Sequence, residues 1–219
     1  TILQERAKEL GIKVVFETQV VNSDNYEKYD LIVASDGINS KIRTQHKVHF
    51  QPDIDKRRNK FIWLGTHKLF DAFTFIFIKT EHGWIWAHAY RFAKDLSTFI
   101  VECEPKTWID LGFEEMNKKE AIGYLQSLFV DYLNDNPLME NAKHLRDSSV
   151  WMNFPRVTCK KWFHKNIVLL GDAVHTAHFS IGSGTKLAFE DAISLADNIH
   201  KNSNLEKAFK SYQEEREIE

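Results

Sequence analysis

The sequence predicts the fold class α/β (α+β), in which a parallel sheet is interrupted by an antiparallel one. Two short apolar runs, at residues 31–34 and 167–170, have the length and composition of buried parallel strands. Each run is followed by a glycine-containing turn or loop and then by a helical pattern. Between them, residues 61–104 are rich in aromatic and β-branched side chains with hairpin-length breaks, which indicates an antiparallel sheet.

The composition argues against several classes of protein. The 219 residues are enough for one or two domains with a sizeable core, and the formal net charge of −2 creates no global field that would attract nucleic acid or a membrane surface. No apolar run approaches the roughly 18 residues of a membrane span. The only two cysteines, Cys103 and Cys159, form no CxxC pair, so a cytoplasmic location is the default expectation. Since His67, His82 and His88 lack metal-ligand spacing, we expect no metal site.

The chain is expected to begin with a helix and a strand. Leu3, Ala7 and Leu10 form one apolar helical face, and Gly11 suits the end of that helix. Residues 12–16 have the composition of a strand. No Gly-x-Gly-x-x-Gly turn occurs in the sequence.

The strand expected at 31–34 leads into a capped turn. Asp36 and Gly37 predict the turn, and Ser40 can cap a short helix that contains Arg43. Taken alone, this pattern also suits a simple capped turn with a surface arginine.

Residues 51–60 are polar and strongly basic, and two interpretations stay open. The first is a solvated linker between domains. The second is a phosphate-binding edge for a large anionic substrate, because arginine binds phosphate through two parallel hydrogen bonds. The basic residues are Lys56, Arg57, Arg58 and Lys60.

The middle of the chain is expected to form the antiparallel sheet and two helices after it. The later helix has a regular apolar stripe, which we interpret as packing against the core. The strands are expected at 61–64, 72–78, 84–90 and 97–103, the helices at 105–112 and 117–134, and an extended return at 151–162.

Residues 165–199 combine a strand, a glycine-rich loop and a helix. The loop at 171–185 contains three glycines, so the backbone can approach a ligand closely. The helix is expected from about Lys186, and its N-terminus would suit an anionic or electron-rich ligand. Asp172 comes directly after the strand, at the edge where open α/β sheets bind ligands. The expected core face of the helix consists of Ala188, Ala192, Leu195, Ala196 and Ile199, and a further helix at 205–219 ends in a solvated tail from Glu214.

Two motifs resemble those of the FAD-dependent aromatic hydroxylases, the para-hydroxybenzoate hydroxylase-like flavoprotein monooxygenases. Asp36, Gly37, Ser40 and Arg43 match the family's Asp-Gly-x-x-Ser-x-x-Arg signature. The second flavin-binding signature is matched by Gly171-Asp172-Ala173-Val174-His175, Gly182-Ser183-Gly184 and Glu190-Asp191-Ala192.

The resemblance implies a partial FAD-binding, Rossmann-like domain with an inserted substrate domain. Residues 1–50 and 161–219 would form the two parts of the FAD-binding domain, and 51–160 the substrate domain. Because the family's Gly-x-Gly-x-x-Gly unit would lie upstream, the chain is expected to be a fragment that lacks it.

The resemblance also implies FAD and NAD(P)H as cofactors and O2 as a co-substrate. The family's reaction is hydroxylation of an aromatic ring through a flavin C4a-hydroperoxide. His178 is the candidate catalytic residue, with simple packing as the alternative, and His175 is interpreted as structural. The candidate cofactor-binding residues are Asp36, Gly37, Arg43, Gly171, Asp172, Gly182, Ser183, Gly184, Thr185 and Lys186.

The loop from His178 to Lys186 lacks the prolines that are common in the family. In this respect it is similar to the branch that hydroxylates aromatic acyl-CoA thioesters, the salicylyl-CoA 5-hydroxylase and anthraniloyl-CoA monooxygenase branch. Arg57 and Arg58 are then candidates for substrate binding. A tryptophan-hydroxylase-like flavin monooxygenase is one alternative, and a non-catalytic fragment that binds only an aromatic or acyl-CoA ligand is another.

Overall fold

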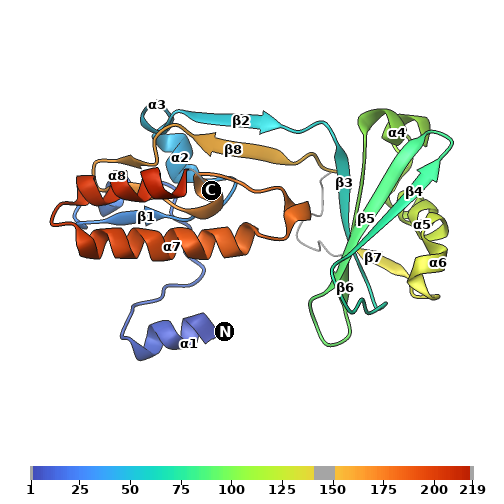
Figure 1. Cartoon of the computed structure of the whole chain (residues 1–219), viewed down its shortest axis with the longest axis horizontal. Helices are drawn as coiled ribbons and strands as arrows, with labels where there is room; N and C mark the ends of the chain where they lie inside the picture. The colour runs from blue at the N-terminus through green and yellow to red at the C-terminus, as the bar shows by residue number, and fades with distance from the viewer. Residues whose placement is uncertain (1, 141–150, 218–219) are drawn as a thin grey trace. The chain divides into compact units, whose positions relative to one another are not determined.

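The computed structural model describes residues 2–140 and 151–217, which fall into two compact units (Figure 1). Unit 1 comprises Thr1–Asp53, Val157–Ala177 and Ser183–Glu219. Unit 2 comprises Ile54–Arg156 together with the short segment His178–Gly182. This segment lies far from the rest of unit 2 in the sequence. The domain boundaries expected from the sequence placed it within the second part of the FAD-binding domain, residues 161–219.

Unit 1 is built on a three-stranded sheet with the order β1-β10-β9. Strand β1 (Ile32–Ala34) runs parallel to β10 (Ile167–Leu169), and β9 (Phe163–His164) is antiparallel to β10. The prediction of a fully buried strand at 31–34 is wrong in part, since Val33 is exposed. Val33 points to the opposite face of the sheet from the buried Ala34, so only one face of β1 is covered.

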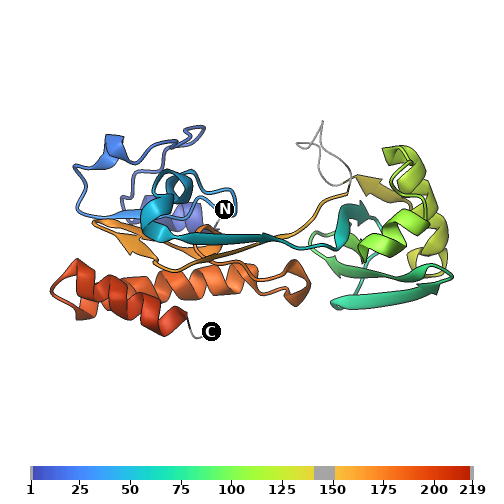
Figure 2. The ribbon, with the colours of Figure 1, turned by 90° about the horizontal axis from the view of Figure 1, so that it is seen from above.

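Two long helices complete the core of unit 1. Helix α7 (Gly184–Lys201) and helix α8 (Leu205–Arg216) lie side by side on one side of the sheet (Figure 2). Leu195 of α7 and Phe209 of α8 share a buried cluster with Val168 of β10. The short helices of this unit are α1 (Ile2–Glu9), α2 (Lys41–Gln45) and α3 (Lys47–Phe50).

The predicted apolar face of α7 is wrong in part. Ala192 and Ala196 are exposed, and the buried positions include three polar ones, Asp191, Ser194 and Asn198. Polar side chains are buried where they find partners. These partners come mainly from α8. The side of α7 that is buried is therefore not the most apolar side of the helix.

The strand predicted at residues 12–16 is absent, because these residues are irregular and exposed. A strand needs a neighbour to accept and donate its backbone hydrogen bonds. No strand in the described ranges pairs with this segment. Helix α1 does form as predicted, and Gly11 follows it with a φ of +71°.

Residues 51–60 do contain a boundary between the two units, as the linker interpretation expects, but part of the segment is a regular strand. Pro52–Lys56 forms strand β2, which pairs with β8 (Pro155–Cys159) in a two-stranded sheet. The chain passes between unit 1 and unit 2 within these two strands, and again on either side of His178–Gly182.

Unit 2 contains a five-stranded sheet with the order β4-β5-β6-β3-β7, as the aromatic and β-branched runs predict. Every neighbouring pair is antiparallel. The short strand β7 is the one strand of this sheet that was not predicted from the sequence. The strands are β3 (Lys60–Thr66), β4 (Thr74–Thr80), β5 (Gly83–Arg91), β6 (Ser97–Cys103) and β7 (Leu138–Glu140).

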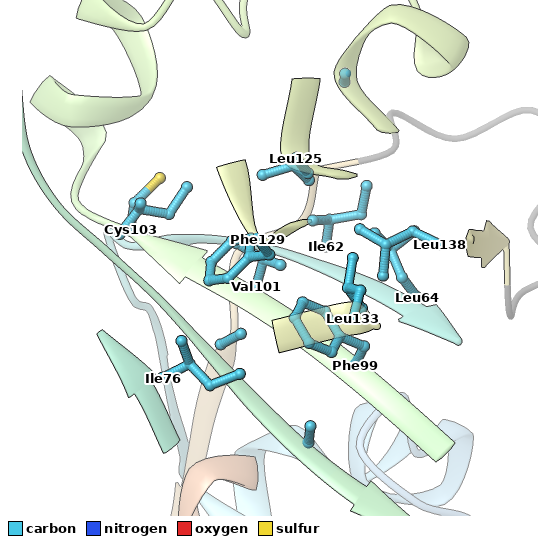
Figure 3. Packing of buried hydrophobic residues seen from close by; sticks show 14 of the residues in the cluster. Ile62, Leu64, Ile76, Phe99, Val101, Cys103, Leu125, Phe129, Leu133 and Leu138 are labelled. Carbon is cyan, nitrogen blue, oxygen red and sulfur yellow. The ribbon is translucent and has the colours of Figure 1, made fainter. Parts of the chain in front are cut away.

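One face of this sheet packs against helices. Alternate strand residues such as Ile62, Phe99 and Val101 meet Leu125 and Phe129 from the helical layer (Figure 3). The helices are α4 (Pro105–Asp110), α5 (Lys118–Leu128) and α6 (Val130–Leu133).

The single helix predicted at 117–134 is interrupted at Phe129, whose φ and ψ are −101° and 15°. Its start is defined by a capping box, in which Asn117 accepts from the backbone N–H of Glu120 and Glu120 accepts from that of Asn117. No helix in residues 2–140 and 151–217 is long and apolar enough to cross a membrane.

Candidate functional site

The two predicted motifs of unit 1 meet at one edge of the parallel sheet. Ala34 and Leu169 are paired residues of β1 and β10. Asp36 and Gly171 each follow two residues later, so both turns leave the sheet at its carboxyl edge. This is the edge at which open α/β sheets bind ligands.

The turn after β1 is held by its own acidic residue. Asp36 Oδ2 accepts hydrogen bonds from the backbone N–H groups of Lys41 (2.7 Å) and Ile42 (3.3 Å), at the start of α2. Ser40 Oγ accepts from the N–H of Arg43 at 2.9 Å, which confirms the predicted cap. Gly37 has a φ of +78°, a conformation that favours glycine.

Arg43 joins the two motifs and is not a surface arginine. Its side chain is 3% exposed. Nη1 donates to the carbonyl oxygen of Ala173 at 2.9 Å, and Nη2 donates to that of Ile38 at 2.6 Å. The guanidinium therefore ties the turn after β1 to the turn after β10.

Gly171 begins the turn after β10, the 3-10 segment Gly171–Ala173. Its φ is +61°, and a Cβ atom at this position would lie 3.1 Å from Cβ of Ala188 on α7. Its N–H donates to Asp191 Oδ2 at 3.0 Å. The glycine therefore allows the turn to lie directly against the helix.

A buried ionic cluster centres on Asp191, which is 0% exposed. His175 Nε2 lies 2.8 Å from its Oδ2, and Arg216 Nε donates to Oδ1 at 2.9 Å. Burial by itself would raise the pKa of Asp191, but the hydrogen bonds with His175, Arg216 and Gly171 outweigh it and lower that pKa. His175 is thus held by structural contacts.

Arg216 corrects the prediction of a solvated tail after Glu214. It is buried and pairs with Asp191 at 2.9 Å and with Glu190 at 3.4 Å. The sequence does contain one signal that points to it. An aspartate such as Asp191 on the core side of a helix requires a cationic partner.

Asp172 differs from Asp191 because its side chain is exposed. No hydrogen bond from the described part of the chain reaches its carboxylate. Partial desolvation raises the pKa of Asp172, and the nearby His175 opposes that shift. The carboxylate is available to a ligand at the edge of the sheet.

The glycine-rich loop leads into α7, which begins at Gly184, two residues before the predicted start. Its first turn contains no acidic residue, so its N–H groups and the helix dipole are not compensated there. A Cβ at Gly184 would meet open space. Thr185 is exposed, and Lys186 Nζ pairs with Glu190 at 2.8 Å.

These groups fit the electron-rich end of a flavin. The N–H groups in the first turn of α7 can donate to it, and Asp172 can accept from a hydroxyl group. Ser183 to Lys186 lie in unit 1 with the two turns, whereas Gly182, whose φ is +68°, belongs to unit 2.

The candidate residues of unit 2 line one cavity of about 400 Å³. His178, Arg57 and Arg58 are brought together there from segments that are far apart in the sequence. The cavity lies against the sheet face opposite the helices. Its other lining residues are Asn59, Phe75, Phe77, Trp86, His88, Glu102 and Ser180.

His178 is held by a short turn and by aromatic rings. Its Nδ1 lies 2.7 Å from Ser180 Oγ, and its ring meets that of Phe154 edge to face at 4.9 Å. Its Nε2 is 3.8 Å from Glu102 Oε1, on the side of the cavity. The next residue, Phe179, packs on Phe61 at a ring distance of 4.6 Å.

The two candidate arginines differ in their surroundings. Arg57 Nη1 pairs with Asp55 at 3.0 Å, which partly neutralises it. Arg58 lies beside it on the cavity wall, and its carbonyl oxygen accepts from Asn153 Nδ2 at 2.9 Å.

Glu102 and His88 are functional candidates that the sequence motifs do not include; His88 was considered only as a metal ligand, and was excluded. Strand periodicity contains a signal for both. Trp86 and His88 point to one face of β5, and Ile100 and Glu102 point to one face of β6. In the described ranges, no three His, Cys, Asp or Glu side chains come together as a metal site.

Comparison with known proteins identifies the family of this chain. The family model described as "FAD binding domain" matches residues 1–218. Salicyloyl-CoA 5-hydroxylase from a Streptomyces species is 38% identical over 99% of this chain and 42% of its own length. The 3-hydroxy-4-methyl-anthranilyl-[aryl-carrier protein] 5-monooxygenase of Streptosporangium sibiricum is 33% identical over 98% of this chain and 55% of its own length. The chain thus spans about half the length of these relatives.

A solved structure shares the fold. The tetrameric form of 2-methyl-3-hydroxypyridine-5-carboxylic acid oxygenase superposes with a TM-score of 0.73 and 16% identity, over 99% of this chain and 60% of that one. Because the family model covers almost the whole chain, the chain belongs to the family of FAD binding domains.

Proposed function

We propose that the protein containing this chain is a FAD- and NAD(P)H-dependent monooxygenase that hydroxylates an aromatic acyl thioester. The observation that carries the proposal is the 38% identity with a salicyloyl-CoA 5-hydroxylase along 99% of this chain. The printed name of the second relative also describes an aromatic acyl group on a carrier. Both names therefore point to an aromatic acid that is attached to a larger carrier.

Unit 1 is the part that we assign to FAD. Bound FAD would supply the redox chemistry that activates O2, with electrons from NAD(P)H. The uncompensated first turn of α7, from Gly184 to Lys186, would donate hydrogen bonds to its electron-rich edge. Asp172 would accept from a hydroxyl group of the cofactor, while Asp36, Gly37, Arg43 and Gly171 keep the two turns in place.

Unit 2 is the part that we assign to the substrate. The aromatic walls of its cavity suit a flat ring, and His178 is positioned to orient a polar group on that ring. Arg57 and Arg58 would bind phosphate groups of a CoA carrier.

The cysteines concern the location of the protein. Cys103 and Cys159 are free and buried, which agrees with a cytoplasmic protein.

Substrate-stimulated oxidation of NAD(P)H by the FAD-loaded protein tests this proposal. Salicylyl-CoA and anthraniloyl-CoA are expected to stimulate the reaction more than the free acids do. Replacing Arg57 and Arg58 by Ala should raise the KM for the thioester and leave the flavin content unchanged. The matched control is Lys207→Ala with Lys210→Ala, two exposed cations of unit 1, which should change neither.

Salt provides a second measurement. Ion pairs between exposed groups are screened beyond about 8–10 Å at moderate ionic strength, so the KM for the thioester should rise with salt. Equal stimulation by free acid and thioester, or a preference for tryptophan, would refute the thioester assignment.

A further inference from the structure

His88 lines the aromatic cavity, and the hydrogen-bonding capacity of its ring nitrogens is not used. It is 1% exposed, and neither ring nitrogen has a hydrogen-bond partner in the described part of the chain. Buried polar atoms without partners are costly, and each one requires an explanation. The rings of Phe75 and Phe179 lie 5.3 and 5.4 Å from it, so aromatic side chains surround it.

Glu102 lies beside His88 and is 4% exposed. Its Oε1 accepts one hydrogen bond, from Asn59 Nδ2 at 2.9 Å. Its Oε2 lies 3.8 Å from His88 Nε2, which is too long for a hydrogen bond. No residue within 2–140 or 151–217 donates to Oε2, so this oxygen is an open acceptor at the cavity wall.

The histidines do not neutralise this carboxylate with a closed ion pair. Burial, followed by the effect of His178, lowers the pKa of His88 to about 4, so its ring is neutral at physiological pH. His178 Nε2 also stays 3.8 Å from Glu102. A buried acceptor between two imidazole rings is thus left with unused hydrogen-bonding capacity.

The surroundings restrict what can use this capacity. Phe75, Phe77 and Trp86 line the same cavity, which favours a flat aromatic ring. A carboxylate among aromatic walls selects a ligand with a hydrogen-bond donor, because a ligand without one would leave it desolvated and unpaired.

We propose that Glu102, between His88 and His178, is a specificity-determining residue that accepts a hydrogen bond from a hydroxyl or amino group on the substrate ring. This role rests on the proposed function and names the ring substituent that the site requires. Because Asn59 already satisfies Oε1, Oε2 is the atom that we assign to the substrate.

The test compares ligands and variants by calorimetric titration of the FAD-loaded protein without NAD(P)H, so that no turnover occurs. Wild-type protein should bind salicylyl-CoA about tenfold more tightly than benzoyl-CoA or ortho-methoxybenzoyl-CoA, neither of which carries a donor. In Glu102→Gln this preference should largely disappear, and benzoyl-CoA should bind at least as tightly as to the wild type, because no charge is left unpaired. Glu104→Gln is the matched control, since Glu104 is exposed two residues further along the chain and should keep the preference.

The ligand comparison needs no variant and stands even if Glu102→Gln does not fold. Equal binding of salicylyl-CoA and ortho-methoxybenzoyl-CoA by the wild type would overturn the role of Glu102, and so would an unchanged preference in folded Glu102→Gln. In both cases the thioester assignment would survive. Binding of none of the thioesters would instead refute the proposed function, and the role of Glu102 with it.

Discussion

The ion pair between Arg216 and Asp191 provides the sharpest test of how unit 1 is held together. Both side chains are buried, and they connect α8 to α7 and to the turn after β10. Arg216→Gln removes the cation but keeps a long side chain that can donate a hydrogen bond. It leaves the Asp191 carboxylate without its charged partner.

The size of the effect follows from the contacts. Breaking one side of a buried ion pair costs about 3–5 kcal/mol. We expect a loss of about 3 kcal/mol in the free energy of unfolding, at the low end of that range, because Gly171 and His175 still satisfy Oδ2 of Asp191. For a chain of this size, that loss lowers the Tm by about 6–12 °C.

Urea unfolding followed by circular dichroism measures this loss, with Lys210→Gln as the control on the same helix. Lys210 pairs with Glu214 at 3.8 Å, and both side chains are exposed, so the control should cost less than about 0.5 kcal/mol. If the two variants unfold at the same urea concentration, the Asp191 cluster does not stabilise the fold as we argue.

The pH dependence gives an independent check. The pKa of Asp191 is lower in the folded chain than its ordinary value, so its contribution to stability is present above that ordinary value. The contribution disappears as pH falls through the folded pKa. The difference between wild type and Arg216→Gln should therefore shrink below about pH 4.

Two further predictions concern the turn after β10. Asp172→Ala should weaken FAD binding about tenfold, or ~1.4 kcal/mol, in a fluorescence titration. The control Asp197→Ala, on the exposed side of α7, should leave FAD binding unchanged. Equal affinity of both variants for FAD would refute the role of Asp172. Gly171→Ala should destabilise the chain by about 1–3 kcal/mol, because its φ is +61° and its new Cβ would lie 3.1 Å from that of Ala188. Gly123→Ala on the exposed side of helix α5, where a Cβ meets nothing within 4 Å, should instead stabilise the chain by about 0.5–1 kcal/mol in the same unfolding assay.

The sequence by itself determined the features that depend on local pattern. Aromatic and β-branched runs predicted four of the five strands in the sheet of unit 2. The Ser40 cap and the two glycine-containing turns were readable because capping and positive φ are properties of a few neighbouring residues. The family also follows from the sequence, since its motifs are short and ordered.

Two elements could not be assigned correctly from local pattern. Residues 12–16 have the composition of a strand but lack a partner in the described structure, and strand formation depends on that partner. The basic segment at 51–60 has no alternating apolar pattern, yet residues 52–56 pair with β8, which lies about a hundred residues away.

Only the tertiary structure decided how the polar groups are buried. Arg216 and Asp191 are separated by 25 residues, and His178 lies 76 residues from Glu102, so no local spacing relates them. A charged residue looks solvated in a sequence whenever its partner is distant. Folding removes water from the carboxylate and from its distant partner at the same time. In the absence of water, an Asp or Glu side chain must bind a specific donor, either in the protein or in a ligand.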